Sequence, residues 1–347
     1  MPTKPKVIVD PHNRGVDEIF SDADLNRLHD MAEVIWGKDE PMPVEAVAEA
    51  LPEAEAIICA RWRYDDLLYQ APHLRAILTV AGSFPLGFDY DYCYKNRIHV
   101  LTCAPAFARQ VAEMALAMAL AAGREIVVGD RAMRANEEHY RKEGNVGTFM
   151  LYDQPVGFIG YGSLARSLNP LLKPFNCQIS VYDPWLGNGY LQRQAVTPVD
   201  LETLMSQSQI IFVLATPTVE NRALLSRELL EKIRPGAALI LVSRAHVVDF
   251  DALTELVLAG RFRAAIDVFP REPLEPDHPI RQAPNAILSA HRAGTVKEGL
   301  WEIGEMVLDD LEVILQGLPP RRLNQAVPEL SGRYATPRVP SGAKKSA

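Results

Sequence analysis

The stretch that most constrains the fold of this chain covers residues 156–165. Four mostly apolar residues lead into a G-x-G-x-x-A turn whose two glycines are Gly160 and Gly162. A helix-like segment follows, and then a second apolar run, 179–182, which ends in Asp183, 23 residues after Gly160. This order of strand, glycine turn, helix, strand and acid predicts a β-α-β unit that binds a dinucleotide.

Each position of the motif has a physical task in such a site. Gly160 allows a tight turn, Gly162 lets a pyrophosphate approach the backbone, and the small side chain of Ala165 lets the helix pack closely on the strand. The N-terminus of the helix offers free N–H groups and the positive end of its dipole to the phosphates. The alternative is a glycine turn in an α/β protein that binds no nucleotide.

The acid at the end of the second run indicates which form of the cofactor binds. Asp183 stands where a carboxylate accepts hydrogen bonds from the adenosine ribose hydroxyls. The same charge repels a 2′-phosphate, and no arginine follows directly in Asp183-Pro184-Trp185-Leu186. The sequence therefore favours NAD over NADP.

Composition excludes several other classes of protein. The 347 residues suffice for two domains with a substantial core, and 48% apolar with 23% charged residues is ordinary for a soluble globular protein. A formal net charge of −8 argues against a general nucleic-acid binder. No apolar run is long enough to cross a bilayer, and the first residues lack the apolar region of a signal peptide. Four scattered cysteines without C-x-x-C spacing predict neither a metal site nor a disulfide framework, and they suit a reducing cytoplasm.

Hydrophobic patterning divides the chain into two α/β units. In the first hundred residues an amphipathic helix is expected at 22–32, and strands are expected at 7–9, 56–59, 76–80 and 100–102. After residue 156 the alternation resumes. Further strands are expected at 210–214, 238–242, 264–266 and 286–288, and helices at 226–233 and 250–258.

Two long helical patterns flank the second unit. The first, 111–122, predicts a buried helix, and the last, 298–315, is expected to pack back on the first unit. The polar segment 129–150 is too long for a turn and is either an exposed arm or a subunit contact. The expected parts are a substrate domain of residues 1–105 plus 297–328, a cofactor domain of residues 106–296, and a disordered tail of residues 329–347.

Three polar residues follow strand patterns of the second unit: Arg244, Glu272 and His291. Ligands of open parallel sheets bind outside the carboxyl ends of the strands, so we expect these residues to converge beside a nicotinamide. Arginine can hold a carboxylate, histidine can exchange a proton with a hydroxyl, and a nearby glutamate favours and orients the imidazolium. These are the steps of 2-hydroxy acid oxidation. Taken singly, each residue also fits a structural role: a surface ion-pair arginine, a solvated loop acid, a core histidine.

Together these residues and the motifs around them resemble the D-isomer-specific 2-hydroxyacid dehydrogenases. The similarity extends to about residue 325 and includes 239–249, Asp267-Val268-Phe269, Glu272-Pro273-Leu274, Asp277-His278-Pro279, Pro284-Asn285, His291-Arg292-Ala293-Gly294, and Pro105 with Val111-Ala112-Glu113. The resemblance implies two Rossmann-like or flavodoxin-like domains with parallel sheets and an active site in the cleft between them. It also implies a homodimer formed through the cofactor domain, with residues around 125–150 reaching toward the partner.

The resemblance assigns roles residue by residue. Arg244, Glu272 and His291 correspond to the catalytic residues, and the substrate carboxylate would bind backbone N–H groups of Gly82 and Ser83. Asp267 would bind the nicotinamide carboxamide, and Thr216 with Pro217 would line the ribose side. The full set of implied cofactor-binding residues is Gly160, Gly162, Ser163, Leu164, Asp183, Thr216, Pro217, Ser243, Asp267 and Gly294.

The sequence departs from the family pattern in four places. The family's Ala-Arg-Gly reads Ser243-Arg244-Ala245, Arg292 replaces a mostly apolar residue, and Phe84-Pro85 interrupts the substrate loop. The fourth departure is the pair Arg61 and Arg63, where the family places its loop for the substrate side chain. These two arginines either bind a second anionic group of the substrate or belong to a solvated basic loop.

We therefore predict a cytoplasmic, homodimeric, NAD-dependent enzyme that acts on a small D-2-hydroxy acid or 2-keto acid. Glu272 argues against formate, because the family's formate enzymes use glutamine there, and the absence of lysine from 76–90 argues against phosphite. The alternative is a binding protein that senses NAD(H) on the same fold, similar to the transcriptional corepressors of this superfamily.

Overall fold

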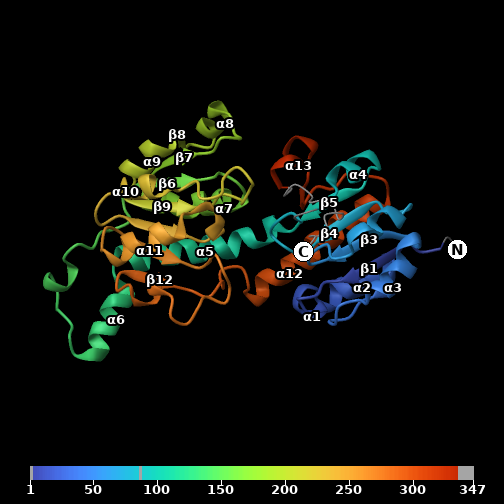
Figure 1. The fold of residues 1–347 in the computed structure, drawn as a ribbon, viewed down its shortest axis with the longest axis horizontal. Helices are drawn as coiled ribbons and strands as arrows, with labels where there is room; N and C mark the ends of the chain where they lie inside the picture. The colour runs from blue at the N-terminus through green and yellow to red at the C-terminus, as the bar shows by residue number, and fades with distance from the viewer. Residues whose placement is uncertain (1–2, 86–87, 335–347) are drawn as a thin grey trace, which may run out of the picture. The chain divides into compact units, whose positions relative to one another are not determined.

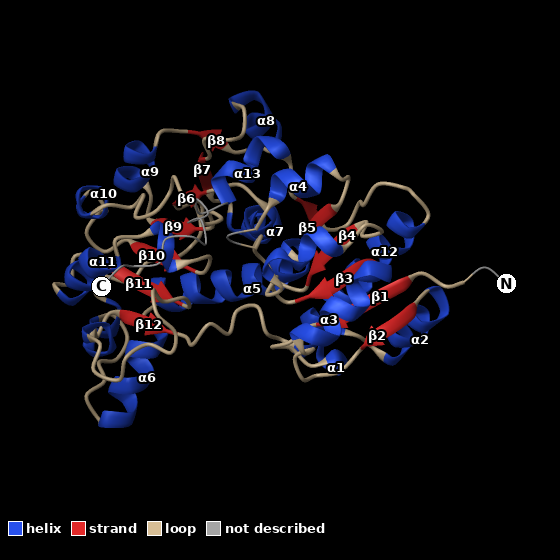
Figure 2. Ribbon diagram, turned by 45° about the vertical axis from the view of Figure 1, so that its right-hand side comes forward, coloured by secondary structure: helices blue, strands red, loops and turns tan. Residues whose placement is uncertain are grey.

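Two mostly parallel sheets carry the fold, one in each of two units (Figures 1 and 2). The computed structural model describes residues 3–85 and 88–334. Unit 1 consists of Met1–Phe107 and Val296–Ala347, and unit 2 of Ala108–Thr295. The predicted α/β class with two parallel-sheet units is confirmed.

The sheet of unit 1 has the order β13-β5-β4-β3-β1-β2. Strands β1 to β5 pair in parallel, and the short edge strand β13 is antiparallel to β5. The order β2-β1-β3-β4-β5 is flavodoxin-like and reverses direction between β1 and β3. The strands are β1 (Lys6–Asp10), β2 (Glu33–Trp36), β3 (Ala54–Cys59), β4 (Ala76–Thr79), β5 (His99–Thr102) and β13 (Asn324–Gln325).

Edge strand β2 was not predicted from the sequence. None of its residues is fully buried, so its apolar and polar residues show no clear alternation. The helices and short 3₁₀ turns of unit 1 are α1 (Val16–Ile19), α2 (Asp22–Met31), α3 (Val44–Ala50), η1 (Leu51–Glu53), η2 (Asp65–Gln70), α4 (Tyr90–Lys95), α12 (Lys297–Leu315) and α13 (Pro328–Tyr334). Helix α12 brings the end of the chain back to the first sheet. Its Ile303, Val307 and Leu311 are buried in the same apolar cluster as β1.

The end of the chain differs from the predicted tail. Residues 328–334 form α13 rather than irregular structure, and Leu330 packs against an apolar cluster that also holds Tyr90 and Cys93 of α4. This apolar contact gives the segment a packed face that its polar composition does not reveal. Residues 335–347, the remainder of the predicted tail, lie outside the described residues.

The sheet of unit 2 has the order β12-β11-β10-β9-β6-β7-β8, with every neighbouring pair parallel. This is the doubly wound Rossmann order, and it reverses between β6 and β9. Strands β9, β10 and β11 are buried along their whole length, which explains why β9 and β10 are apolar throughout and why β11 is apolar after Arg263. The strands are β6 (Pro155–Ile159), β7 (Gln178–Tyr182), β8 (Thr197–Pro198), β9 (Ile210–Val213), β10 (Ala238–Leu241), β11 (Arg263–Ile266) and β12 (Ala286–Leu288).

Helices cover this sheet, and α5 joins it to unit 1 along the chain. The helical elements are α5 (Ala104–Gly123), α6 (Ile126–Ala135), η3 (Glu143–Asn145), α7 (Ser163–Leu172), η4 (Lys173–Phe175), α8 (Asn188–Arg193), α9 (Leu201–Gln207), α10 (Arg227–Glu231), η5 (Ala245–Val247), α11 (Phe250–Leu258) and η6 (Pro279–Gln282). In the part of the chain that the structure describes, no helix is both long and apolar enough to cross a membrane.

The segment expected as an arm or a subunit contact consists of α6 and the irregular chain after it, which extend away from the sheet of unit 2 (Figure 1). Arg263 of β11 forms hydrogen bonds with both ends of this segment. The Arg263 guanidinium donates to Glu125 Oε1 at 3.0 and 2.6 Å and to the carbonyl of Gly147 at 2.8 Å. Large apolar side chains of the segment are exposed: Ile126, Val128, Met133, Tyr140, Val146 and Met150.

Candidate active site

The glycine turn follows β6, at the point where the strand order of unit 2 reverses. Gly160 has a φ of +89°, and a Cβ there would lie 2.8 Å from the Cα of Ala215, so only glycine fits. At Gly162 a Cβ would meet nothing within 4 Å. Helix α7 begins with Ser163 and Leu164, and no side chain of residues 3–85 and 88–334 caps its N-terminus. The turn therefore presents uncapped N–H groups to open space, as a dinucleotide phosphate requires.

Asp183 lies directly after β7, the strand next to β6. Its Oδ2 accepts a hydrogen bond from the Tyr161 N–H at 2.8 Å, and its Oδ1 accepts one from the Trp185 N–H at 2.9 Å. These bonds fix the carboxylate beside the glycine turn. Because each carboxylate oxygen can accept more than one hydrogen bond, both oxygens can still take bonds from ribose hydroxyls.

On the other side of the reversal, Thr216 and Pro217 follow β9. The carbonyl of Thr216 accepts a hydrogen bond from Asn221 Nδ2 at 2.8 Å. His246 Nε2 lies 2.8 Å from the carbonyl of Thr218 and ties the loop to η5. The exposed Thr216 side chain therefore belongs to a loop that these two contacts hold in place.

Two buried hydroxyls at this edge have no hydrogen-bond partner among the described residues. They are the Oγ atoms of Ser243, after β10, and of Ser289, after β12. A buried hydroxyl without a partner costs free energy, so the positions favour a ligand or water that completes the bonding. Ser243 is among the predicted cofactor residues. Ser289 was missed, because a serine beside a strand end carries no signal in a single sequence.

Asp267, after β11, shapes the loop that carries His291. Its side chain is 1% exposed, and its two carboxylate oxygens accept hydrogen bonds from the N–H groups of Arg292 and Ala293 at 2.9 and 3.1 Å. Its carbonyl accepts a bond from the His291 N–H at 2.8 Å. The half-buried Gly294 ends this loop. Asp267 is therefore bonded to three successive backbone groups, in addition to any bond to a carboxamide.

His291 and Glu272 are in contact although they are 19 positions apart in the sequence. His291 Nδ1 lies 2.6 Å from Glu272 Oε2, and Glu272 Oε1 accepts a hydrogen bond from the Phe269 N–H at 3.0 Å. A carboxylate only accepts, so the bond places a proton on Nδ1. The Nε2 atom has no hydrogen-bond partner in the described ranges, and the ring is exposed. His291 also has a φ of +53°, a left-handed conformation that is uncommon outside glycine and clusters at functional sites.

Arg244 follows β10 and is half-buried. Burial lowers the pKa of its guanidinium, and the nearby negative charge of Glu272 opposes that effect. One nitrogen, Nη1, donates to the carbonyl of Ser243 at 2.7 Å, and the other guanidinium nitrogens have no hydrogen bond within the described chain. The next residue, Ala245, begins η5, so the glycine of the family pattern is not needed for the backbone.

The predicted substrate residues lie at the carboxyl edge of unit 1. Gly82 and Ser83 follow β4 and are half-buried. A Cβ at Gly82 would lie 3.3 Å from Cδ2 of Phe107, so the position favours a small residue. The carbonyl of Pro85 accepts a hydrogen bond from the Tyr90 hydroxyl at 2.6 Å, and this bond fixes the loop at Pro85. The next two residues of that loop, 86–87, lie outside the described residues.

The two arginines after β3 have different environments. Arg63 Nε and Nη2 donate to the buried Asp10 Oδ2 at 3.1 and 2.6 Å, and the Tyr64 hydroxyl also donates to that atom. Arg63 thus forms an ion pair within unit 1. The sequence analysis considered only a substrate anion or a solvated loop for this residue. Arg61 is exposed and forms no ion pair or hydrogen bond with the residues described. Sequence analysis missed Asp10 because its partner is 53 residues away.

Predicted cofactor and catalytic residues thus follow adjacent strands of unit 2, and predicted substrate residues follow β3 and β4 of unit 1. The family model for the NAD binding domain of the D-isomer specific 2-hydroxyacid dehydrogenases matches residues 116–293. The chain belongs to this family. The prediction of the family is confirmed, and so is a cofactor of the NAD(P) class. The preference for NAD and the roles of single residues stay predictions.

Comparison with individual proteins gives the same family. A crystal structure of a phosphoglycerate oxidoreductase from Rhizobium etli is 36% identical, with a TM-score of 0.83, and the match covers 94% of this chain and 99% of that one. A glyoxylate reductase from Aeropyrum pernix is 28% identical over 320 residues, 89% of this chain and 95% of that protein. A D-3-phosphoglycerate dehydrogenase from Archaeoglobus fulgidus is 27% identical over 282 residues, 81% of this chain. The match spans only 53% of that dehydrogenase.

The ion pair of Arg63 with Asp10 leads to a prediction about stability. We expect Arg63→Ala to lower the free energy of unfolding by about 3 kcal/mol, because it leaves a buried carboxylate without its cation. Denaturation with urea measures the change. Arg61→Ala is the matched control, and its exposed side chain should contribute within about 0.5 kcal/mol. Equal effects of the two substitutions would show that the ion pair contributes nothing.

Proposed function

We propose that this protein is an NAD-dependent oxidoreductase that transfers a hydride between nicotinamide C4 and C2 of a D-2-hydroxy acid or 2-keto acid. The observation that carries the proposal is the 2.6 Å contact of His291 with Glu272, next to the half-buried Arg244. A cation for a carboxylate and a proton donor for an oxygen at the adjacent carbon are what this reaction needs.

The residues around the glycine turn fit the cofactor. Uncapped N–H groups of Ser163 and Leu164 would bind the pyrophosphate, and Asp183 would bind the adenosine ribose. When bound, the nicotinamide ring accepts or supplies the hydride. The buried hydroxyl of Ser243 would gain a partner. The carboxylate of Asp183 supports NAD over NADP, because its charge repels a 2′-phosphate.

Arg244 would bind the substrate carboxylate. Its planar guanidinium can donate two parallel hydrogen bonds, which orient the substrate as well as hold it. Partial burial strengthens this interaction, because fewer waters screen the charges. For Gly82 and Ser83 we keep the role that the family resemblance implies, backbone N–H donors to a substrate carboxylate.

His291 would exchange the proton of the reacting oxygen. Because Nδ1 is bound to Glu272, the exchanging atom is Nε2, which donates in reduction of the keto acid and accepts in oxidation of the hydroxy acid. The carboxylate of Glu272 stabilises the imidazolium and fixes the ring orientation. The contact of Glu272 with the Phe269 N–H in turn holds the carboxylate in place.

The test of this function is a turnover assay. Purified protein with NADH should reduce at least one member of a panel of 2-keto acids, and His291→Ala should lower kcat by 10²-fold or more. The dissociation constant of NADH should stay within about twofold, because the imidazole acts on the substrate oxygen. Tight NADH binding without turnover of any acid would contradict the enzyme and favour the NAD(H)-sensing alternative.

A second prediction concerns cofactor choice. Wild-type protein should bind NAD more tightly than NADP, and Asp183→Ala should weaken NAD binding by about tenfold while NADP binding improves. Titration calorimetry with both cofactors measures the four constants. A wild-type protein that prefers NADP would refute the proposed role of this carboxylate.

We also propose that the protein is a homodimer whose subunits meet through residues 126–150. The exposed apolar side chains of Met133 and Val146 support this, because a segment that exposes several large apolar side chains often marks an interaction surface. A cytoplasmic location stays a prediction from the cysteine pattern.

Light scattering tests the dimer. The wild-type chain should show about twice its mass of 38.5 kDa, and the double variant Met133→Glu with Val146→Glu should be monomeric. Leu258→Glu, at a similarly exposed apolar site on α11, is the control and should remain dimeric. A monomeric wild type, or a dimer unaffected by the double variant, would contradict the proposed interface.

A further inference from the structure

An additional cation lies at the carboxyl edge of unit 1, where the direction of the strand order reverses. Strands β1, β3 and β4 are adjacent and parallel, so the segments that follow them meet at one edge of the sheet. In open α/β sheets ligands bind at the reversal, here between β1 and β3. The segment after β3 carries Arg61, and the segment after β1 carries Arg14.

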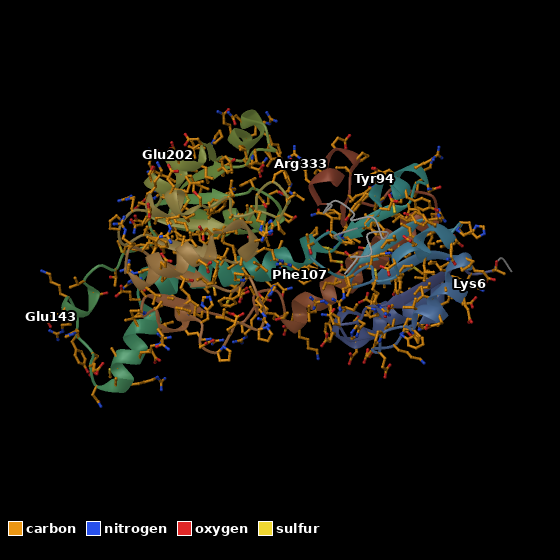
Figure 3. The ribbon with its side chains drawn as sticks, viewed as in Figure 1. Lys6, Tyr94, Phe107, Glu143, Glu202 and Arg333 are labelled. Atoms are coloured by element: carbon orange, nitrogen blue, oxygen red, sulfur yellow. The ribbon has the colours of Figure 1, made fainter. Side chains whose placement is uncertain are left out.

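Arg14 lies close to the proposed substrate loop. Its Cζ is 5.4 Å from the centre of the Phe107 ring, a cation–π arrangement. The same ring lies close to Gly82, because a Cβ at that position would lie 3.3 Å from Phe107 Cδ2. Phe107 belongs to the first turn of α5 (labelled in Figure 3). One aromatic ring therefore connects the guanidinium of Arg14 with the backbone that we assign to the substrate carboxylate.

Among the described residues Arg14 has no counter-ion, and unlike the equally unpaired Arg61 it is half-buried. Arg27, Arg63 and Arg75 each form ion pairs with acids of unit 1. In the described ranges the Arg14 guanidinium forms no ion pair within 4.0 Å and no side-chain hydrogen bond.

Of the acids that follow Arg14 closely in the sequence, Glu18 is already engaged. Glu18 Oε2 accepts a hydrogen bond from the Gly15 N–H at 3.1 Å. Burial lowers the pKa of the Arg14 guanidinium, and the charge of Glu18 opposes this effect only in part. A half-buried cation without a bound anion costs free energy, and an anionic ligand would recover that cost.

We infer that Arg14 binds a second anionic group of the substrate, so that the preferred substrate is a 2-keto acid or 2-hydroxy acid with a phosphate or second carboxylate on its far end. This inference rests on the proposed function. Arg14 suits the task better than the exposed Arg61, because a charge near apolar surface is screened less by water. A guanidinium can also bind either anion through two parallel hydrogen bonds.

The experiment compares pairs of keto acids that differ in one anionic group. The first pair is hydroxypyruvate and its 3-phosphate ester, and the second is 2-oxobutanoate and 2-oxoglutarate. Wild-type protein should have the higher kcat/KM for the dianionic member of at least one pair, which also identifies whether phosphate or carboxylate is preferred. Arg14→Met should lower that kcat/KM by about 10- to 100-fold and change the monoanionic member by less than about twofold.

Two further variants, Arg14→Lys and Lys95→Met, serve as controls for Arg14→Met. Methionine keeps the apolar stem that packs on Phe107, and Arg14→Lys keeps a positive charge and should retain part of the preference. Lys95→Met removes an exposed charge at the end of α4 in the same unit and should leave the ratio of the two kcat/KM values unchanged. A thermal midpoint close to wild type shows that each variant is folded.

A binding measurement separates recognition from chemistry. Keto acid together with NAD⁺ forms a complex that cannot react, because both partners are oxidised. Calorimetry on this complex measures the Kd of the preferred dianionic acid. In Arg14→Met this Kd should rise by the same factor as the one by which kcat/KM falls.

Three other results would contradict the inference, and they can be told apart. Equal losses for both members of a pair overturn the inference, because Arg14 would then act on the common carboxylate or on the fold. A wild type that reduces monoanionic acids at least as well as dianionic ones overturns the inference and leaves the proposed function standing. A wild type that reduces none of the acids overturns both.

Discussion

The chemistry at the edge of unit 2 depends on one buried carboxylate. Asp267 accepts hydrogen bonds from the N–H groups of Arg292 and Ala293, and its carbonyl accepts one from His291. These three bonds hold the loop after β12 in the conformation that gives His291 its positive φ. A backbone in that region is costly for a residue with a side chain, and it persists only where neighbouring contacts demand it. The contact of His291 with Glu272, and with it the proposed proton exchange, depends on this loop.

The strand order reverses in both sheets, but the residues placed at the two reversals differ. In each sheet the strand order reverses, and polar side chains gather where the reversed strands end. Unit 2 places backbone N–H groups and a carboxylate there, which suits a dinucleotide. Unit 1 places Arg14 and Arg61 there, which suits an anion. The two edges therefore carry complementary preferences, one for the phosphates and ribose of a cofactor and one for a charged small acid.

Much of this arrangement could be predicted from residues that are close in the chain. The glycine turn with Asp183 is a local pattern, and the order of Arg244, Glu272 and His291 matched a family that the comparison then established. Strand β2 and helix α13 were missed because partial burial leaves no clear hydrophobic period. Ser289 was missed because the only sign of its importance is a buried hydroxyl that has no partner in the described part of the chain.

The amino-acid sequence by itself determined the two parallel sheets, the cofactor turn and the identity of the candidate catalytic residues, because apolar periodicity and motif spacing are properties of short segments. Only the tertiary structure decided how the arginines of unit 1 are used. Arg63 is bound to Asp10, 53 residues away, and Arg14, beside Phe107, has no counter-ion among the residues that the structure describes. Which charges meet depends on the pairing of β1 with β3 and on the packing of α5, and no local pattern encodes those distances.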